Sequence, residues 1–151
     1  GFNRYQEIYQ DKAAPLPESL FSTAYGLVRE LLESREDQYF LHGDLHHSNL
    51  LYQEDGSWIA IDPKGVIGEL ACEVGPYLFN PVPDLFRQPN LDKLLSRRLR
   101  ILSEITALDE QRLAAWSFCR AVLAAIWSLE EGETNLSYWL EVADLMKHQI
   151  Q

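Results

Sequence analysis

Apolar side chains recur at three- and four-residue steps along much of the chain, which is the period of an amphipathic helix. The pattern predicts helices over residues 20–34 and 91–105, and a third that begins with Asp109 as its N-cap and stops at Gly132. A last helix is predicted over residues 135–146. The first constraint on the fold is therefore that most of the chain must pack as helices around a shared core.

The middle of the chain follows a different pattern. Short apolar runs at residues 39–41, 50–52 and 58–61 are typical of strands. Between the last two runs stands Asp55-Gly56, a strong hairpin signal because glycine supplies the positive φ that the turn requires. We therefore expect a strand, a polar loop and a β-hairpin in this order.

Two further segments lack a clear period. Eight prolines and glycines interrupt the stretch that follows Asp62, so residues 63–89 are expected to be loops with one short helix within 70–78. The polar start, which Pro15 and Pro17 close, is expected to be irregular. Together these patterns predict an α+β, mostly helical fold with a small β-hairpin insert, in a single domain over residues 1–151.

Composition supports a globular domain with a real core. The 151 residues are 46% apolar and 11% aromatic, which is enough to bury a sizeable hydrophobic interior. Cys72 and Cys119 each lie in an apolar stretch without a paired Cys-x-x-Cys spacing, which predicts two buried free thiols rather than a disulfide or a zinc site.

The charge balance bears on partners. A net charge of −10 repels nucleic acid and anionic membranes and would attract a cationic ligand, although solubility alone also explains an acidic surface. There is no uninterrupted apolar run of membrane-spanning length, and the first residues lack the basic and apolar regions of a signal peptide. We expect a cytoplasmic protein that binds a small molecule, with no nucleic-acid or membrane partner.

The residues with the clearest chemical signal lie in the loop after the first strand and at the end of the hairpin. The pattern is His42-x-Asp44-x-x-x-x-Asn49, followed by Asp62. Phosphoryl transfer requires a group that orients a hydroxyl and relieves it of its proton, and oxygen ligands for Mg²⁺. Two carboxylates and an amide in this order can supply both. Either residue of the loop taken alone would more simply be a turn that caps its own backbone.

This segment resembles the kinase catalytic loop His-Arg-Asp-Leu-x-x-x-Asn, with Gly43 in place of arginine. With Asp62-Pro63-Lys64-Gly65 standing where protein kinases have Asp-Phe-Gly, it looks like the aminoglycoside/hydroxyurea antibiotic resistance kinases, a family in the aminoglycoside phosphotransferase branch of the protein-kinase-like fold. The resemblance implies the C-terminal lobe of that fold and an enzyme that uses ATP and Mg²⁺. The implied acceptor is a hydroxyl of an aminoglycoside such as streptomycin.

The resemblance also implies roles for individual residues. Asp44 would be the catalytic base, Asn49 and Asp62 would hold Mg²⁺ and through it ATP, and His42 and Glu73 would brace the loop. Acidic side chains line the acceptor cleft in related kinases, so Glu130, Glu131 and Glu133 are candidate contacts for a cationic substrate, together with His46.

One part of the kinase pattern has no counterpart here. No glycine-rich loop is followed by a strand with a nucleotide-binding lysine, so the N-terminal nucleotide lobe is expected to be absent from this chain and to be supplied by the same, longer polypeptide. A non-catalytic binding module or orphan kinase-like lobe is therefore an alternative, as is a housekeeping sugar or metabolite kinase.

Two details of the loop stay open. His42, Asp44, His46 and His47 crowd four possible metal ligands into six residues, as in binuclear metallohydrolases, but His148 is the one other histidine in the sequence. Lys64 could approach a phosphate or could be an ordinary exposed lysine.

Overall fold

A computed structural model describes residues 1–10, 14–34, 37–82, 84–132 and 135–150. The α-helices are α1 (Phe2–Tyr9), α2 (Glu18–Glu33), α3 (Val74–Leu78), α4 (Leu91–Thr106), α5 (Glu110–Glu131) and α6 (Leu136–Lys147). Three 3-10 turns are η1 (His47–Asn49), η2 (Leu70–Glu73) and η3 (Asp84–Arg87). The strands are β1 (Tyr39–Leu41), β2 (Leu50–Tyr52), β3 (Trp58–Ala60) and β4 (Val66–Gly68).

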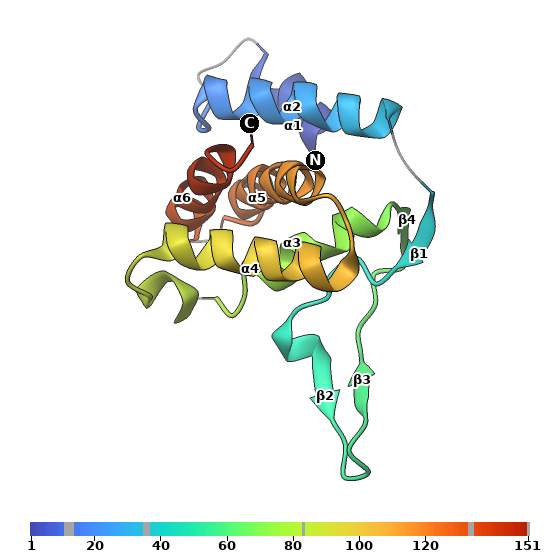
Figure 1. Ribbon diagram of the computed structural model, residues 1–151. Coiled ribbons are helices and arrows are strands. Elements are labelled where there is room, and N and C mark those ends of the chain that lie inside the picture. The colour runs from blue at the N-terminus through green and yellow to red at the C-terminus, as the bar shows by residue number, and fades with distance from the viewer. Residues whose placement is uncertain (11–13, 35–36, 83, 133–134, 151) are drawn as a thin grey trace.

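Helix α5 is the centre of the fold (Figure 1). α1 and α2 lie on one side of it, α3 and α4 lie on another, and α6 packs along it. The Asp109 side chain accepts a hydrogen bond from Arg112 N (2.7 Å), and Gly132 ends the helix with φ 70°, as the sequence predicts. By length and composition α5 could span a membrane, but 67% of its most apolar window is buried inside this fold, as expected of a core helix.

The predicted helices at 20–34, 91–105 and 135–146 are confirmed by α2, α4 and α6. The prediction of an irregular start is wrong, because residues 2–9 form α1. Tyr5 is 4% exposed, its ring lies 4.9 Å from that of Phe21 on α2, and its hydroxyl accepts a hydrogen bond from Leu16 N. A few aromatic residues at helical spacing thus anchor a short helix whose remaining side chains are mostly polar.

The strands form two antiparallel pairs. β2 and β3 pair through Leu50–Ala60 and Tyr52–Trp58, and Gly56 in the connecting turn has φ 86°. β1 pairs with β4, with Leu41 opposite Val66. Strand β4 was not predicted, since residues 63–89 were expected to be loops and one short helix, and the helix is η2 followed by α3. In Figure 1 the β2–β3 hairpin projects away from the helical body, with the other pair at its base.

Candidate functional site

The His42 ring connects the loop after β1 to the end of the hairpin. Its Nδ1 accepts a hydrogen bond from Asp44 N (3.3 Å), so Nε2 carries the proton and donates to Ile61 O (2.7 Å). Lys64 N donates to His42 O (2.8 Å) from the other direction. His42 therefore fixes the positions of Asp44 and of the residue before Asp62 in one bonded unit.

Asn49 stands at the base of the hairpin, directly across from Ile61. Its carbonyl oxygen accepts from Ile61 N (2.9 Å), and its side-chain Nδ2 donates to Asp44 O (2.9 Å). The amide nitrogen is thus engaged, while Oδ1, the atom able to bind a metal, is left out of this bond. Asp62 follows Ile61 with an exposed side chain and φ 63°, a left-handed conformation that is uncommon outside glycine.

Three cationic or ionisable side chains surround the Asp44 carboxylate, which is 26% exposed. Arg120 Nη2 lies 3.6 Å from Oδ1, and Lys64 Nζ and His46 Nε2 lie 3.9 Å and 4.0 Å from Oδ2. These three distances to the Asp44 carboxylate are typical of ion pairs and are longer than hydrogen bonds. None of the three side chains therefore makes a short hydrogen bond to the carboxylate. Asp44 thus has cationic or ionisable neighbours on both carboxylate oxygens, at distances that leave each oxygen open to a further hydrogen bond.

The Glu73 carboxylate is hydrogen-bonded to the backbone of the loop that carries Asp44. Its two carboxylate oxygens accept from Gly43 N at 2.9 Å and 3.2 Å. Gly43 has φ 80°, and a Cβ at this position would lie 2.9 Å from Val66 Cγ2. Both the conformation and the close approach of β4 require glycine where protein kinases have arginine.

Asp44 lines a cavity of about 520 Å³ between the loop, α3, α5 and α6. The same cavity is lined by His46, Asn80, Arg120, Trp127, Glu131 and Trp139, which combine aromatic walls with one carboxylate besides Asp44. The three acidic residues predicted to contact a cationic substrate lie in different places. Glu131 lines the cavity, Glu130 lies 3.6 Å from Arg4 of α1, and Glu133 lies outside the described residues.

A sequence profile of the aminoglycoside/hydroxyurea antibiotic resistance kinases matches residues 2–132. The chain belongs to this family. It is 32% identical over 124 residues to the streptomycin 6-kinase of Streptomyces glaucescens, a match that covers 82% of this chain and 40% of that protein. The streptomycin 3''-kinase of Klebsiella pneumoniae is 34% identical over 111 residues, 72% of this chain and 42% of its own length.

A hydroxyurea phosphotransferase of Kitasatospora aureofaciens is 36% identical over 96 residues, 64% of this chain and 26% of its own. The chain thus spans less than half of the length of these curated relatives. No solved structure matches it significantly.

Several residues at the site of this family member were not singled out from the sequence. Arg120 reaches Asp44 from α5, and Tyr77 of α3 stacks on His47 with 4.5 Å between ring centroids. Burial and the nearby Arg98 lower the pKa of His47. Arg120 carries a signal that could have found it, since it is the sole charged residue between Arg112 and Glu130 in an otherwise apolar helix.

The binuclear metal alternative finds no support in the geometry. Across the ranges that the structure describes, no group of three or more His, Cys, Asp or Glu side chains is arranged to hold a metal. Both ring nitrogens of His42 are engaged in hydrogen bonds, and His46 Nδ1 accepts from Ser48 N (3.3 Å). An Asn–Asp pair such as Asn49 and Asp62 is a different kind of site, since it offers only oxygen ligands.

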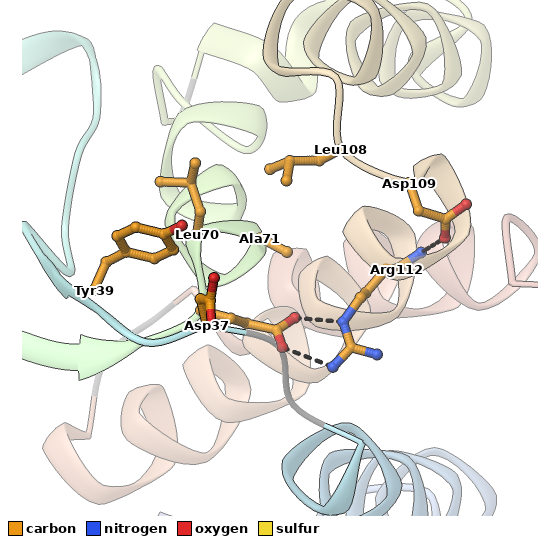
Figure 2. Close-up of a pocket in the computed structure, with 8 residues that line it drawn as sticks. Asp37, Tyr39, Leu70, Ala71, Leu108, Asp109 and Arg112 are labelled. Atoms are coloured by element: carbon orange, nitrogen blue, oxygen red, sulfur yellow. Dashed lines mark hydrogen bonds and ion pairs between the residues drawn. The ribbon is translucent and has the colours of Figure 1, made fainter.

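A second, smaller cavity of about 110 Å³ is structural in character (Figure 2). Its polar groups are bonded to one another: Arg112 Nε and Nη2 donate to Glu69 at 2.7 Å and 2.6 Å, and Asp109 caps α5. Arg112 also donates to Leu31 O and Ser34 O at the end of α2. This cavity shares no lining residue with the one at Asp44.

Proposed function

We propose that this chain is the catalytic, acceptor-binding part of a kinase that transfers the γ-phosphate of ATP to a hydroxyl of a small cationic molecule, an aminoglycoside such as streptomycin. The observation that carries the proposal is that Asp44 lines the same cavity as Glu131, while hydrogen bonds through His42 and Asn49 tie Asp44 to the end of the hairpin where Asp62 stands. A proton acceptor, a cation-binding acid and two oxygen ligands then belong to one connected site.

In this proposal Asp44 orients the acceptor hydroxyl and takes up its proton as the oxygen attacks phosphorus. Little other covalent chemistry is needed, because phosphoryl transfer depends mainly on positioning and on charge stabilisation. Lys64, with its Nζ 3.9 Å from Asp44, lies where its charge would stabilise a transferring phosphate. His42 keeps the loop in register and takes no part in proton transfer, because both of its nitrogens are engaged.

Asn49 Oδ1 and the Asp62 carboxylate would hold Mg²⁺. Both are oxygen donors, which Mg²⁺ prefers, and they stand at the same end of the β2–β3 hairpin, where Asn49 O accepts from Ile61 N. Asp62 keeps its strained backbone there, which is typical of residues with a functional constraint. When bound, the metal would neutralise charge on the phosphate oxygens.

We further propose that a nucleotide-binding lobe outside these 151 residues covers the strands. Their outer surface is apolar and exposed: Phe40 is 79%, Ile67 71% and Trp58 65% accessible. Large apolar side chains exposed on both strand pairs are typical of an interaction site. The curated relatives are more than twice as long as the matched region, which leaves room for such a lobe.

The acceptor class follows from the walls of the cavity. Trp127 and Trp139 offer flat apolar faces, and Glu131 offers a negative charge to an ammonium or guanidinium group. A neutral sugar would use the aromatic faces but not the carboxylate. A housekeeping sugar kinase is therefore the second candidate. The two candidates differ in whether replacing Glu131 weakens binding of the acceptor.

The test is Mg²⁺-dependent phosphate transfer from radiolabelled ATP by the complete polypeptide, with streptomycin, other aminoglycosides, hydroxyurea and simple sugars as acceptors. We expect transfer to a cationic acceptor, and a KM for that acceptor that rises at least about 10-fold in Glu131→Gln, the loss of a charged hydrogen bond. Glu104→Gln, an exposed matched change on α4, should leave KM unchanged. No transfer to any acceptor, with no ATP binding, would overturn the proposal in favour of a binding module.

A further inference from the structure

Arg120 connects the proposed base to the core helix α5. Its guanidinium Nη2 lies 3.6 Å from Asp44 Oδ1, and its Cζ lies 4.7 Å from the centroid of the Trp127 ring. Trp127 stands seven residues later on the same helix, so the two side chains lie along one face of α5. The guanidinium is therefore held between an aromatic face and the carboxylate.

The stem of Arg120 is fixed as well. Gly75 of α3 packs directly against it, so that a Cβ at position 75 would lie 3.0 Å from Arg120 Cγ and 3.1 Å from its Cβ. Gly75 is a helical residue without a positive φ, and its lack of a side chain serves this close approach. Backbone on one side and an indole ring on the other leave the Arg120 side chain little freedom.

Charge and burial explain why a residue is held so firmly there. The side chain is only 26% exposed, and burial lowers the pKa of Arg120 while Asp44 and Glu73 raise it. A guanidinium taken this far out of water is costly unless a carboxylate compensates it. Asp44 and Glu73 are the two carboxylates that do so, and both belong to the loop machinery described above.

The contacts of Asp44 are asymmetric. Arg120 is the partner of Oδ1, whereas Lys64 and His46 approach Oδ2 at 3.9 Å and 4.0 Å. Of these three, Arg120 comes from the rigid core helix, and the other two stand on the loop segments themselves. A carboxylate anchored at one oxygen by a core residue keeps the other oxygen in a defined place.

We propose that Arg120 is a positioning residue for Asp44: it fixes Oδ1, and the Arg120–Trp127 contact keeps Oδ2 directed to the acceptor hydroxyl in the cavity that Trp127 also lines. This inference rests on the proposed kinase function of the site. Arg120 itself touches neither of the reacting atoms, so its removal should affect the rate of the chemical step more than the binding of the acceptor.

The test compares Arg120→Met and Arg120→Lys in the complete polypeptide, with Arg100→Met on the exposed face of α4 as the matched control. Arg120→Met should lower kcat roughly 100-fold, the cost of a small misplacement of a catalytic group, while KM for the acceptor changes little. Arg120→Lys should recover part of kcat, because a positive charge returns without the planar guanidinium. Arg100→Met should behave as wild type.

Gly75→Ala provides a second, milder variant that keeps every charge. The added methyl group must push the Arg120 stem by a few tenths of an ångström, so kcat should fall while KM is kept. If Arg120→Met does not fold, the kcat of Gly75→Ala alone tests whether Arg120 positions Asp44. A kcat near the wild-type value in both Gly75→Ala and Arg120→Met, beside an inactive Asp44→Ala, would overturn the inference and leave the proposed function standing.

Crystal structures of the wild type and Arg120→Met test the same point without turnover. We expect the Asp44 carboxylate to rotate or lose order in the variant. An Asp44 side chain in the same well-ordered position in both would overturn the inference. A wild type that fails to transfer phosphate would instead sink the proposed function, and this outcome is separate because the two structures still report on Asp44.

Discussion

Asp62 occupies the left-handed backbone conformation, which glycine adopts freely and which, among other residues, asparagine and aspartate adopt most readily. Its φ of 63° costs roughly 1–3 kcal/mol, and such strain persists where the surroundings or the function require it. The residue before it accepts the His42 hydrogen bond, and the residue after it is Pro63. A residue before proline prefers an extended backbone, so the surroundings and not Pro63 hold the left-handed conformation of Asp62, whose carboxylate we propose as a metal ligand.

Replacing Asp62 separates its chemical role from its strain. Asp62→Gly and Asp62→Ala both lose the carboxylate, so both should lose Mg²⁺-dependent turnover. Asp62→Gly should be more stable than Asp62→Ala by about 1 kcal/mol in urea unfolding, because glycine adopts this φ without steric cost. Equal stability of the two variants would argue against strain at this position, and retained turnover would argue against the metal role.

The hydrogen bonds between Glu73 and Gly43 N should contribute to the stability of the loop. Glu73→Ala leaves Gly43 N without its acceptor in a half-buried place, and should lower the free energy of unfolding by about 1–3 kcal/mol. Glu73→Gln keeps one acceptor oxygen and should lose less. Thermal denaturation followed by circular dichroism checks this order, and the order would be refuted if Glu73→Gln were the less stable variant.

The two thiols give a pH dependence. Burial raises the pKa of Cys72 and of Cys119 from 9.0 to about 12, so both stay protonated in the folded chain where the unfolded chain ionises. The folded state therefore holds more protons, and the free energy of unfolding should fall as the pH rises from about 9 toward 12. Cys119 is buried whereas Cys72 is only partly buried, so at pH 8 iodoacetamide should label Cys119 of the folded chain far more slowly than in the unfolded chain, and equally fast labelling of Cys119 would contradict its burial.

At the scale of elements, one buried cluster joins segments that are distant in the sequence. Glu69, which is 5% exposed, receives hydrogen bonds from Arg112 and from Trp116 Nε1, while Arg112 also binds the last carbonyl groups of α2. The start of η2, the end of α2 and the first turns of α5 are thereby held together. Because Glu69 directly follows β4, this cluster also attaches the end of that strand to the helical body.

Breaking this cluster on one side should be severe. Arg112→Leu leaves the Glu69 carboxylate buried without its main partner and should lower the free energy of unfolding by about 3–5 kcal/mol. The double variant Glu69→Leu/Arg112→Leu should recover part of that loss, because no uncompensated charge remains. Urea unfolding of the three proteins decides this, and a double variant less stable than Arg112→Leu would contradict the account.

Elements of this chain differ in how well local patterns predict them. α2, α4 and α5 carry repeated apolar positions and recognisable ends such as Asp109 and Gly132, so period and capping suffice. α1 and β4 are short, and each depends on tertiary partners: Tyr5 on Phe21, and β4 on its pairing with β1. No local rule contains those contacts.

The residues of the site also differ in how well the local sequence predicts them. The order His42, Asp44, Asn49, Asp62 can be read locally because one loop and one hairpin bring these residues together. Arg120 comes from a helix 76 positions after Asp44 in the sequence, and only the packing of α5 against the loop reveals it. A charged residue in the middle of an apolar helix was the signal for it.

At the scale of the whole molecule, a helical body presents the loop at Asp44 on one flank and an uncovered strand surface beside it. The aromatic cavity with Glu131 lies at this loop, and the strands expose Phe40 and Trp58. The chain as a whole carries a net charge of −10. These features are consistent with an acceptor pocket on one side of the loop and a nucleotide lobe on the other.

The most direct measurement is the turnover of the complete polypeptide with Asp44→Ala beside the wild type, at saturating ATP, Mg²⁺ and acceptor. The account predicts a loss of about 10²- to 10⁴-fold in kcat, the usual contribution of a general base, in a protein that still folds although Arg120 loses a carboxylate partner. Turnover near the wild-type value in a folded Asp44→Ala protein would contradict the central claim that this carboxylate receives the proton of the acceptor hydroxyl.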